Sequence, residues 1–159
     1  MLQVPLHAGW TLCAVGGDTD GRVPDTYPAD VPGCVHTNLM TAGVIPDPYQ
    51  DGNEEALRWM YDIGWRYAVA LDPGSQRADP STQVSERVDL VFDGVDTVAT
   101  VRLRDGNEAV ELGRTFNMHR SYRFDITPHL RDRSLALEVD LHSATAFATA
   151  EEQRLGTRP

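Results

Sequence analysis

Short strand-like segments, closely spaced along the second half of the chain, constrain its fold most. Apolar and polar residues alternate in the runs at 65–71, 88–92, 97–103, 108–112, 121–126 and 135–141. We expect turns at Asp93-Gly94 and at Asp105-Gly106-Asn107. No crossover helix separates these runs, as parallel strands would require. The pattern therefore predicts an all-β fold, an antiparallel β-sandwich or jelly roll with short peripheral helices.

The first fifty residues are expected to be extended chain that wraps around another part of the protein. Prolines exclude a long helix or a central strand there, and they stand at Pro24, Pro28, Pro32, Pro46 and Pro48. One short strand is expected from Leu6 to Val15, with Trp10 and Leu12 facing inward. One helical turn is expected from Val35 to Ala42, ended by Gly43.

Two further helices and one loop are expected. Asn53 can cap a helix over Asn53–Met60, in which Glu54 and Glu55 favour the N-terminal end of the helix dipole. A second helix follows Ser143, with Glu151 and Glu152 facing outward. The polar segment from Asp72 to Ser85 is predicted to be a solvated loop.

Length and charge limit the class of protein. The chain has 159 residues, about one domain, and carries 24 acidic residues against 14 basic ones, all of them arginine. The net charge of -10 disfavours binding to nucleic acid, because a phosphate backbone would repel the chain. No apolar run is long enough to span a membrane, and the first residues lack the features of a signal peptide. We therefore expect a cytoplasmic protein with no membrane partner.

The two cysteines, Cys13 and Cys34, are expected to be reduced and buried. The alternative is a metal site that uses Cys34 with His36, but the second short-spaced pair of ligands typical of zinc sites is missing. The segment Gly17–Gly21 lacks the ligand spacing of a calcium loop and is expected to be a turn. Phosphate-binding and dinucleotide fingerprints are also missing, so no metal and no cofactor are predicted.

Catalytic chemistry is hard to find in the residues alone. Glycoside hydrolysis needs two carboxyl groups at a fixed separation. The adjacent pairs Glu54-Glu55 and Glu151-Glu152 point about 100° apart on a helix and indicate solvated helix faces. Tryptophan rings can stack on a sugar or pack in the core, and for Trp59 both interpretations stay open.

Several segments spread along the chain form one pattern. They are 31–39 (VPGCVHTNL), 42–49 (AGVIPDPY), Asn53-Glu54, Trp59, Trp65-Arg66-Tyr67, 92–99 (FDGVDTVA) and 117–130 (NMHRSYRFDITPHL). Together they resemble β-mannosidases of glycoside hydrolase family 2, from about Trp10 to the last residue. The proline-rich segments are similar to the mannosidase branch in particular, whereas the blocks around Phe92 and Phe124 fit the wider family.

The resemblance implies a galactose-binding-like jelly roll over residues 1–159, the N-terminal domain of a longer retaining exo-enzyme. Such an enzyme removes terminal β-D-mannose from oligosaccharides, and a TIM barrel supplies its catalytic glutamates. We expect the piece to be truncated at its C-terminal end, to lack the barrel that would be its partner, and to be inactive alone. The residues expected to face the barrel or the sugar pocket are Asn53, Glu54, Trp59, Asn117 and His119.

Two other functions stay open. The chain can be a stand-alone carbohydrate-binding module, because jelly rolls of this type bind sugars without catalysis. It can also be a purely structural domain that positions a barrel, in which case it has no sugar site. For the five candidate residues, the structural alternative is capping, packing or contact between domains.

Overall fold

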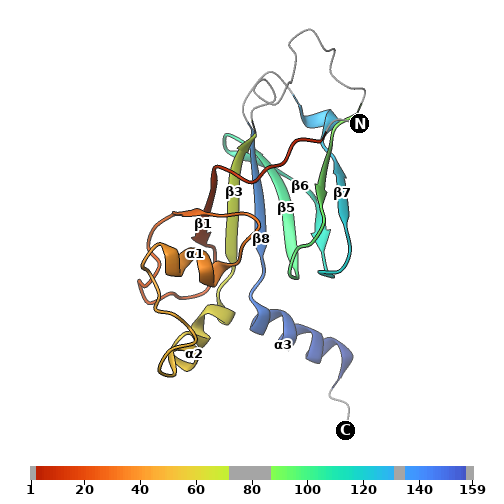
Figure 1. The fold of residues 1–159 in the computed structure, drawn as a ribbon. Helices are drawn as coiled ribbons and strands as arrows, with labels where there is room; N and C mark the ends of the chain where they lie inside the picture. Colours follow the sequence, from red (N-terminus) through yellow and green to blue (C-terminus); the bar gives the residue numbers. More distant parts are fainter. Residues whose placement is uncertain (1–2, 72–86, 131–134, 157–159) are drawn as a thin grey trace.

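The computed structural model describes residues 3–71, 87–130 and 135–156 (Figure 1). Eight strands, three α-helices and two 3₁₀-helices are formed within these ranges. The strands are β1 (Trp10–Ala14), β2 (Tyr27–Ala29), β3 (Trp65–Leu71), β4 (Asp89–Phe92), β5 (Ala99–Asp105), β6 (Glu108–Thr115), β7 (Tyr122–Asp125) and β8 (Leu135–Leu141). The helices are α1 (Val35–Thr41), α2 (Asn53–Ala56), η1 (Arg58–Asp62), η2 (Thr127–His129) and α3 (Ala144–Leu155).

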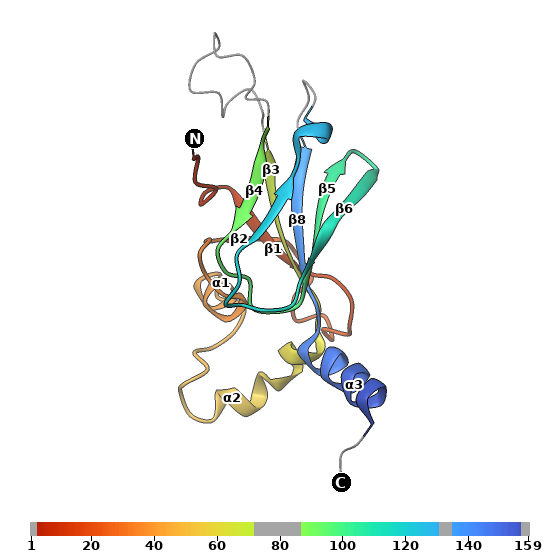
Figure 2. The ribbon, with the colours of Figure 1, turned by 90° about the vertical axis from the view of Figure 1, so that its right-hand side faces the viewer.

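Two antiparallel sheets form the body of the protein. The larger sheet has the strand order β2-β1-β3-β8-β5-β6, and the smaller sheet consists of β4 and β7. Figure 2 shows the smaller sheet lying against one face of the larger one. The prediction of an all-β antiparallel fold with short peripheral helices is confirmed.

The core lies between the sheets because alternate residues of each central strand face inward. On β3, Trp65, Tyr67, Val69 and Leu71 are buried, and on β8 the buried apolar residues are Leu135, Leu137 and Val139. Trp10 and Leu12 of β1 also join the core, as the alternation predicted. The bounds predicted for β3 and β8 are those observed.

The two turns expected in the second half join different kinds of strand neighbours. Asp105 pairs with Glu108, so Gly106 and Asn107 form a two-residue hairpin between β5 and β6, as expected. In contrast, β4 pairs with β7 and not with β5. The segment around Asp93-Gly94 therefore carries the chain from the small sheet to the large one. Local turn residues indicated the change of direction but not the partner strand.

The helix expected over Asn53–Met60 is also different. The α-helix ends at Ala56, and the chain continues as the 3₁₀-helix η1. Gly52, at φ 77°, is the N-cap residue, so the prediction that Asn53 caps this helix is wrong. The left-handed backbone at this position favours glycine, which has no Cβ atom.

The first fifty residues pack around the sheet as predicted. β2, which contains Pro28, forms the edge of the large sheet, where the missing N–H of proline costs no ladder bond. Helix α1 is followed by Gly43 at φ 71°.

Both cysteines are free thiols, but Cys34 is exposed and Cys13 is only half-buried, so the prediction that both are buried is wrong. Cys34 is the N-cap of α1, at the surface end of that helix. The expected loop at 72–85 lies outside the described residues.

Candidate functional site

One end of the large sheet collects all five candidate residues. At this end, one row of paired residues crosses five neighbouring strands. The row consists of Ala14, Trp65, Leu141, Ala99 and Thr115. We call it the helix end, because η1 leads into Trp65 and α3 follows Leu141 there (Figure 1). The segment 116–121 leaves β6 at the same end.

Asn53 and Glu54 begin α2 and differ in what holds them. The Asn53 side-chain amide donates to the carbonyl oxygen of Asp47 at 2.8 Å, and its backbone N–H donates to the carbonyl of Gln50 at 2.9 Å. Asn53 therefore fixes the loop that precedes the helix. Glu54 is exposed, and no described residue pairs with its carboxylate.

Trp59 lies on η1 and packs within the chain. Its ring centroid lies 6.3 Å from that of Trp65, with the planes tilted by 52°. The guanidinium of Arg22 lies 5.3 Å from the Trp59 ring centroid, which is within the range of a cation–π interaction. Since Arg22 covers one face of the ring, a sugar would have to displace it to stack there.

Asn117 and His119 lie together in the turn between β6 and β7. The Asn117 side-chain oxygen accepts from the His119 backbone N–H at 2.8 Å, while the Asn117 backbone N–H donates to the Tyr122 hydroxyl at 2.8 Å. Asn117 therefore builds the turn. The ring of His119 is exposed, flanked by exposed Met118, and Phe116 is exposed at the start of the turn.

The structure thus brings the candidates together as two groups. Asn53, Glu54 and Trp59 belong to the segment that enters β3, and the turn after β6 holds Asn117 and His119. Between these two strands lie β8 and β5, so three strand spacings of about 4.8 Å separate β3 from β6 by about 14 Å. The two groups share one end of the sheet, and among the described residues no hydrogen bond, ion pair or ring contact joins them.

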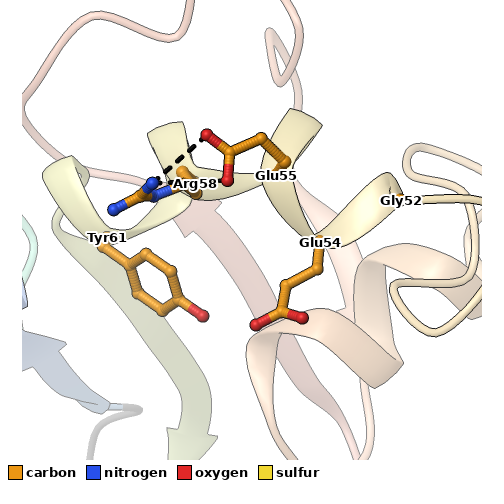
Figure 3. Close-up of a pocket in the computed structure, with 5 residues that line it drawn as sticks. All are labelled: Gly52, Glu54, Glu55, Arg58 and Tyr61. Carbon is orange, nitrogen blue, oxygen red and sulfur yellow. Dashed lines mark hydrogen bonds and ion pairs between the residues drawn. The ribbon is translucent and has the colours of Figure 1, made fainter.

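A pocket of about 470 Å³ lies beside the first group (Figure 3). Its lining residues are Gly52, Glu54, Glu55, Arg58 and Tyr61. Arg58 donates to both carboxylate oxygens of Glu55, at 3.2 and 3.3 Å. The Tyr61 ring lies 6.2 Å from the ring of His36 on α1, and burial lowers the pKa of that histidine.

Sequence reasoning missed Arg58 and Tyr61 as pocket residues and read Glu55 only as part of a solvated face. The signal was a spacing of four and then three residues from Glu54 to Arg58 and Tyr61, which places the three on one side of a helical segment.

Within the described ranges, no three histidine, cysteine, aspartate or glutamate side chains gather as a metal site. Cys34 contacts the Thr37 hydroxyl at 3.4 Å, while His36 faces Tyr61. In the expected turn at 17–21, Asp18 accepts from the backbone N–H of Asp20 at 2.8 Å. None of the helices in the described part of the chain is long and apolar enough to cross a membrane.

Comparison with known proteins decides the family. The model of the glycosyl hydrolase 2 galactose-binding domain-like family matches residues 10–159. The chain belongs to this family. This galactose-binding-like domain also resembles curated β-mannosidases, with 33% identity to that of Bos taurus and 37% to that of Capra hircus, each over 97% of the chain.

A solved structure of a β-mannosidase has the same fold as this chain. The crystal structure of the β-D-mannosidase from Dictyoglomus thermophilum superposes on 93% of this chain, with a TM-score of 0.77 and 28% sequence identity. The chain spans 16% of the length of each of these three relatives. The resemblance to family 2 β-mannosidases is therefore confirmed for this domain, and the activity of a whole enzyme has to be proposed.

Proposed function

We propose that the chain is the N-terminal domain of a retaining exo-β-mannosidase that hydrolyses terminal β-D-mannosyl residues. The observation that carries this proposal is the match of nearly the whole chain to β-mannosidases, at 33% and 37% identity in two of them. In this proposal the catalytic glutamates lie in a separate barrel domain, which is the partner of the 159 residues. The domain alone is inactive, and β-mannoside oligosaccharides are the substrates of the whole enzyme.

We propose further that the helix end contributes to the substrate pocket of that enzyme. The five candidates divide by what their side chains already do. Asn53 and Asn117 hold backbone groups in place, and Trp59 packs against Trp65. Glu54 and His119 present exposed polar groups, so these two are the best candidates for contact with the barrel or the sugar.

A test of the activity uses the whole protein that contains this chain. We expect it to release 4-nitrophenol from 4-nitrophenyl β-D-mannopyranoside, with a much lower kcat/KM for the α-mannoside and the β-glucoside. The 159-residue chain alone is expected to release none. Hydrolysis of the β-glucoside in preference to the β-mannoside would overturn the proposal.

The contribution of the helix end is tested by His119→Ala in the whole protein. We expect a higher KM with a smaller change in kcat, because the residue would bind substrate without taking part in the bond-breaking step. Glu111→Gln is the matched control, since Glu111 lies on β6 and pairs only with Arg114 among the described residues. An unchanged KM in His119→Ala would place the turn after β6 outside the substrate pocket.

The second candidate function is a stand-alone carbohydrate-binding module, which the pocket beside α2 favours. If the chain is such a module, we expect it to bind sugar in a protein that hydrolyses no β-mannoside.

We also propose a cytoplasmic location, which agrees with the two free thiols because the cytoplasm is reducing. Fractionation of the source cells tests it.

A further inference from the structure

The pocket beside α2 has two polar groups that are available to a ligand. The Glu54 carboxylate and the Tyr61 hydroxyl turn toward each other on one side of the pocket (Figure 3). Neither group has a hydrogen-bond partner among the residues that the structure describes, and Tyr61 is 46% exposed. The pocket is therefore a preformed surface with an open ring and two unused hydrogen-bonding groups.

One hydrogen bond holds the backbone of Tyr61, and one neighbouring ring lies near its side chain. The Tyr61 carbonyl oxygen accepts from the Ser143 hydroxyl at 2.9 Å, and the same hydroxyl caps α3 by accepting from the Ala146 N–H at 3.0 Å. The centroid of the His36 ring lies 6.2 Å from that of the Tyr61 ring, with the two planes tilted by 50°. A ring held in this way loses little conformational entropy when it binds a ligand.

Charge around the pocket selects against anions. Glu55 is neutralised by Arg58 at 3.2 Å, so Glu54 leaves the pocket with one uncompensated negative charge. Asp51 and Asp62 flank the same segment and add to the negative potential. Phosphorylated, sulfated or uronic acid ligands would therefore be repelled.

The remaining chemistry fits a neutral sugar. An exposed phenol ring stacks on the apolar face of a pyranose. A carboxylate accepts from neighbouring sugar hydroxyls, and these charge-assisted bonds are stronger than neutral ones. A simple cation would gain only about 1 kcal/mol or less from an exposed carboxylate in water, so the pocket offers it little.

From this we infer that the pocket formed by Glu54, Glu55, Arg58 and Tyr61 binds one neutral pyranoside unit of a saccharide. Tyr61 provides the stacking surface, Glu54 accepts from vicinal hydroxyls, and the Arg58–Glu55 pair borders the site. The inference rests on the proposed function for its choice of sugar, and it names Tyr61 as the residue of this domain that holds that sugar together with Glu54.

The experiment blocks the catalytic centre of the whole protein and then measures sugar binding. The retaining centre is trapped with 2-deoxy-2-fluoro-β-D-mannosyl fluoride, and β-1,4-mannobiose is titrated into the trapped protein by calorimetry. If the protein hydrolyses no β-mannoside, the proposed catalytic function fails, and the titration is run without the trap because the probe is not consumed. The pocket is tested in both cases.

We expect saturable binding that Tyr61→Ala weakens at least ten-fold and Glu54→Gln weakens about three-fold or more. Tyr61→Phe keeps the ring and should lose less than Tyr61→Ala, while Glu111→Gln should bind as the parent does. Mannose 6-phosphate should not compete. The inference is overturned if the trapped protein binds no mannobiose, if both Tyr61→Ala and Glu54→Gln bind it as tightly as the parent, or if 0.5 M sodium chloride abolishes binding as it would for a cation site.

Discussion

The two faces of the large sheet are built from the same central strands but are held by different interactions. On β8, Leu137 is 1% exposed on the face toward the small sheet, and its neighbour Glu138 is 5% exposed on the opposite face. Both residues are buried. One is surrounded by apolar side chains, whereas the other is surrounded by arginines.

The charged face is a connected cluster of five residues, which we call the arginine cluster. Asp140 accepts from Arg66 at 2.6 and 2.9 Å and also pairs with Arg102. Glu138 accepts from Arg104 at 2.5 and 3.1 Å and lies 3.6 Å from Arg66. Arg66 therefore links the two carboxylates.

This difference shows how one alternating pattern can serve two purposes. Apolar burial stabilises in proportion to area and does not depend on direction. A buried carboxylate stabilises only while its donors are in place, because an unpaired buried charge is costly. The inner face should therefore supply the larger share of the stability, and the outer face should fix how β3, β8 and β5 line up.

The largest expected effect is loss of a core side chain. We expect Leu137→Ala to lower the free energy of unfolding by about 2–5 kcal/mol, because it removes buried methyl groups and leaves a cavity. Urea unfolding of the chain, followed by tryptophan fluorescence, measures the change. Leu155→Ala is the control, since Leu155 is 68% exposed on α3 and should change stability by less than about 0.5 kcal/mol. Equal losses in both variants would contradict the assignment of the core.

A smaller loss is expected from the arginine cluster. Glu138→Gln removes the charge that Arg104 and Arg66 share. Because both arginines reach solvent, we discount the loss expected for a fully buried pair and expect about 1–2 kcal/mol. Glu111→Gln, in the exposed pair with Arg114, should cost about 0.5 kcal/mol or less in the same urea experiment. If Glu138→Gln is as harmless as Glu111→Gln, the cluster is only a surface feature.

The sequence could predict the alternation on both faces but not the partners. β3 and β8 have the predicted bounds because Val, Leu and aromatic residues recur at every second position. Arg66 and Asp140 are 74 residues apart, and nothing in the local pattern pairs them. The same limit explains the turn at Asp93-Gly94, where local residues indicate a turn but the long-range pairing of β4 with β7 decides the sheet.

The candidate site was predictable only in part, for a related reason. Family resemblance selected Asn53, Glu54 and Trp59 by their motif, and of these three Glu54 lines the pocket beside α2. Tyr61 was missed because it lies between the segments that carry the resemblance, although its spacing from Glu54 and Arg58 fits one side of a helical segment. Arg22, which lies over Trp59, comes from a distant loop. Contacts of that kind require the folded arrangement.

The smallest expected effect is on the pH dependence of stability. Burial works against ionisation of Asp140, but the hydrogen bond and charge of Arg66, together with Arg102, lower the pKa of this carboxyl below its ordinary value. Its contribution is therefore present above the unfolded-state pKa of about 4 and is lost as the pH falls through the lower folded-state pKa. Between pH 5 and pH 2, the free energy of unfolding should fall less steeply in Asp140→Asn than in the parent. Leu137→Ala should lower stability by a similar amount at every pH, because no charge is removed. Parallel curves for Asp140→Asn and the parent would mean that the outer face is held by packing, as the inner face is.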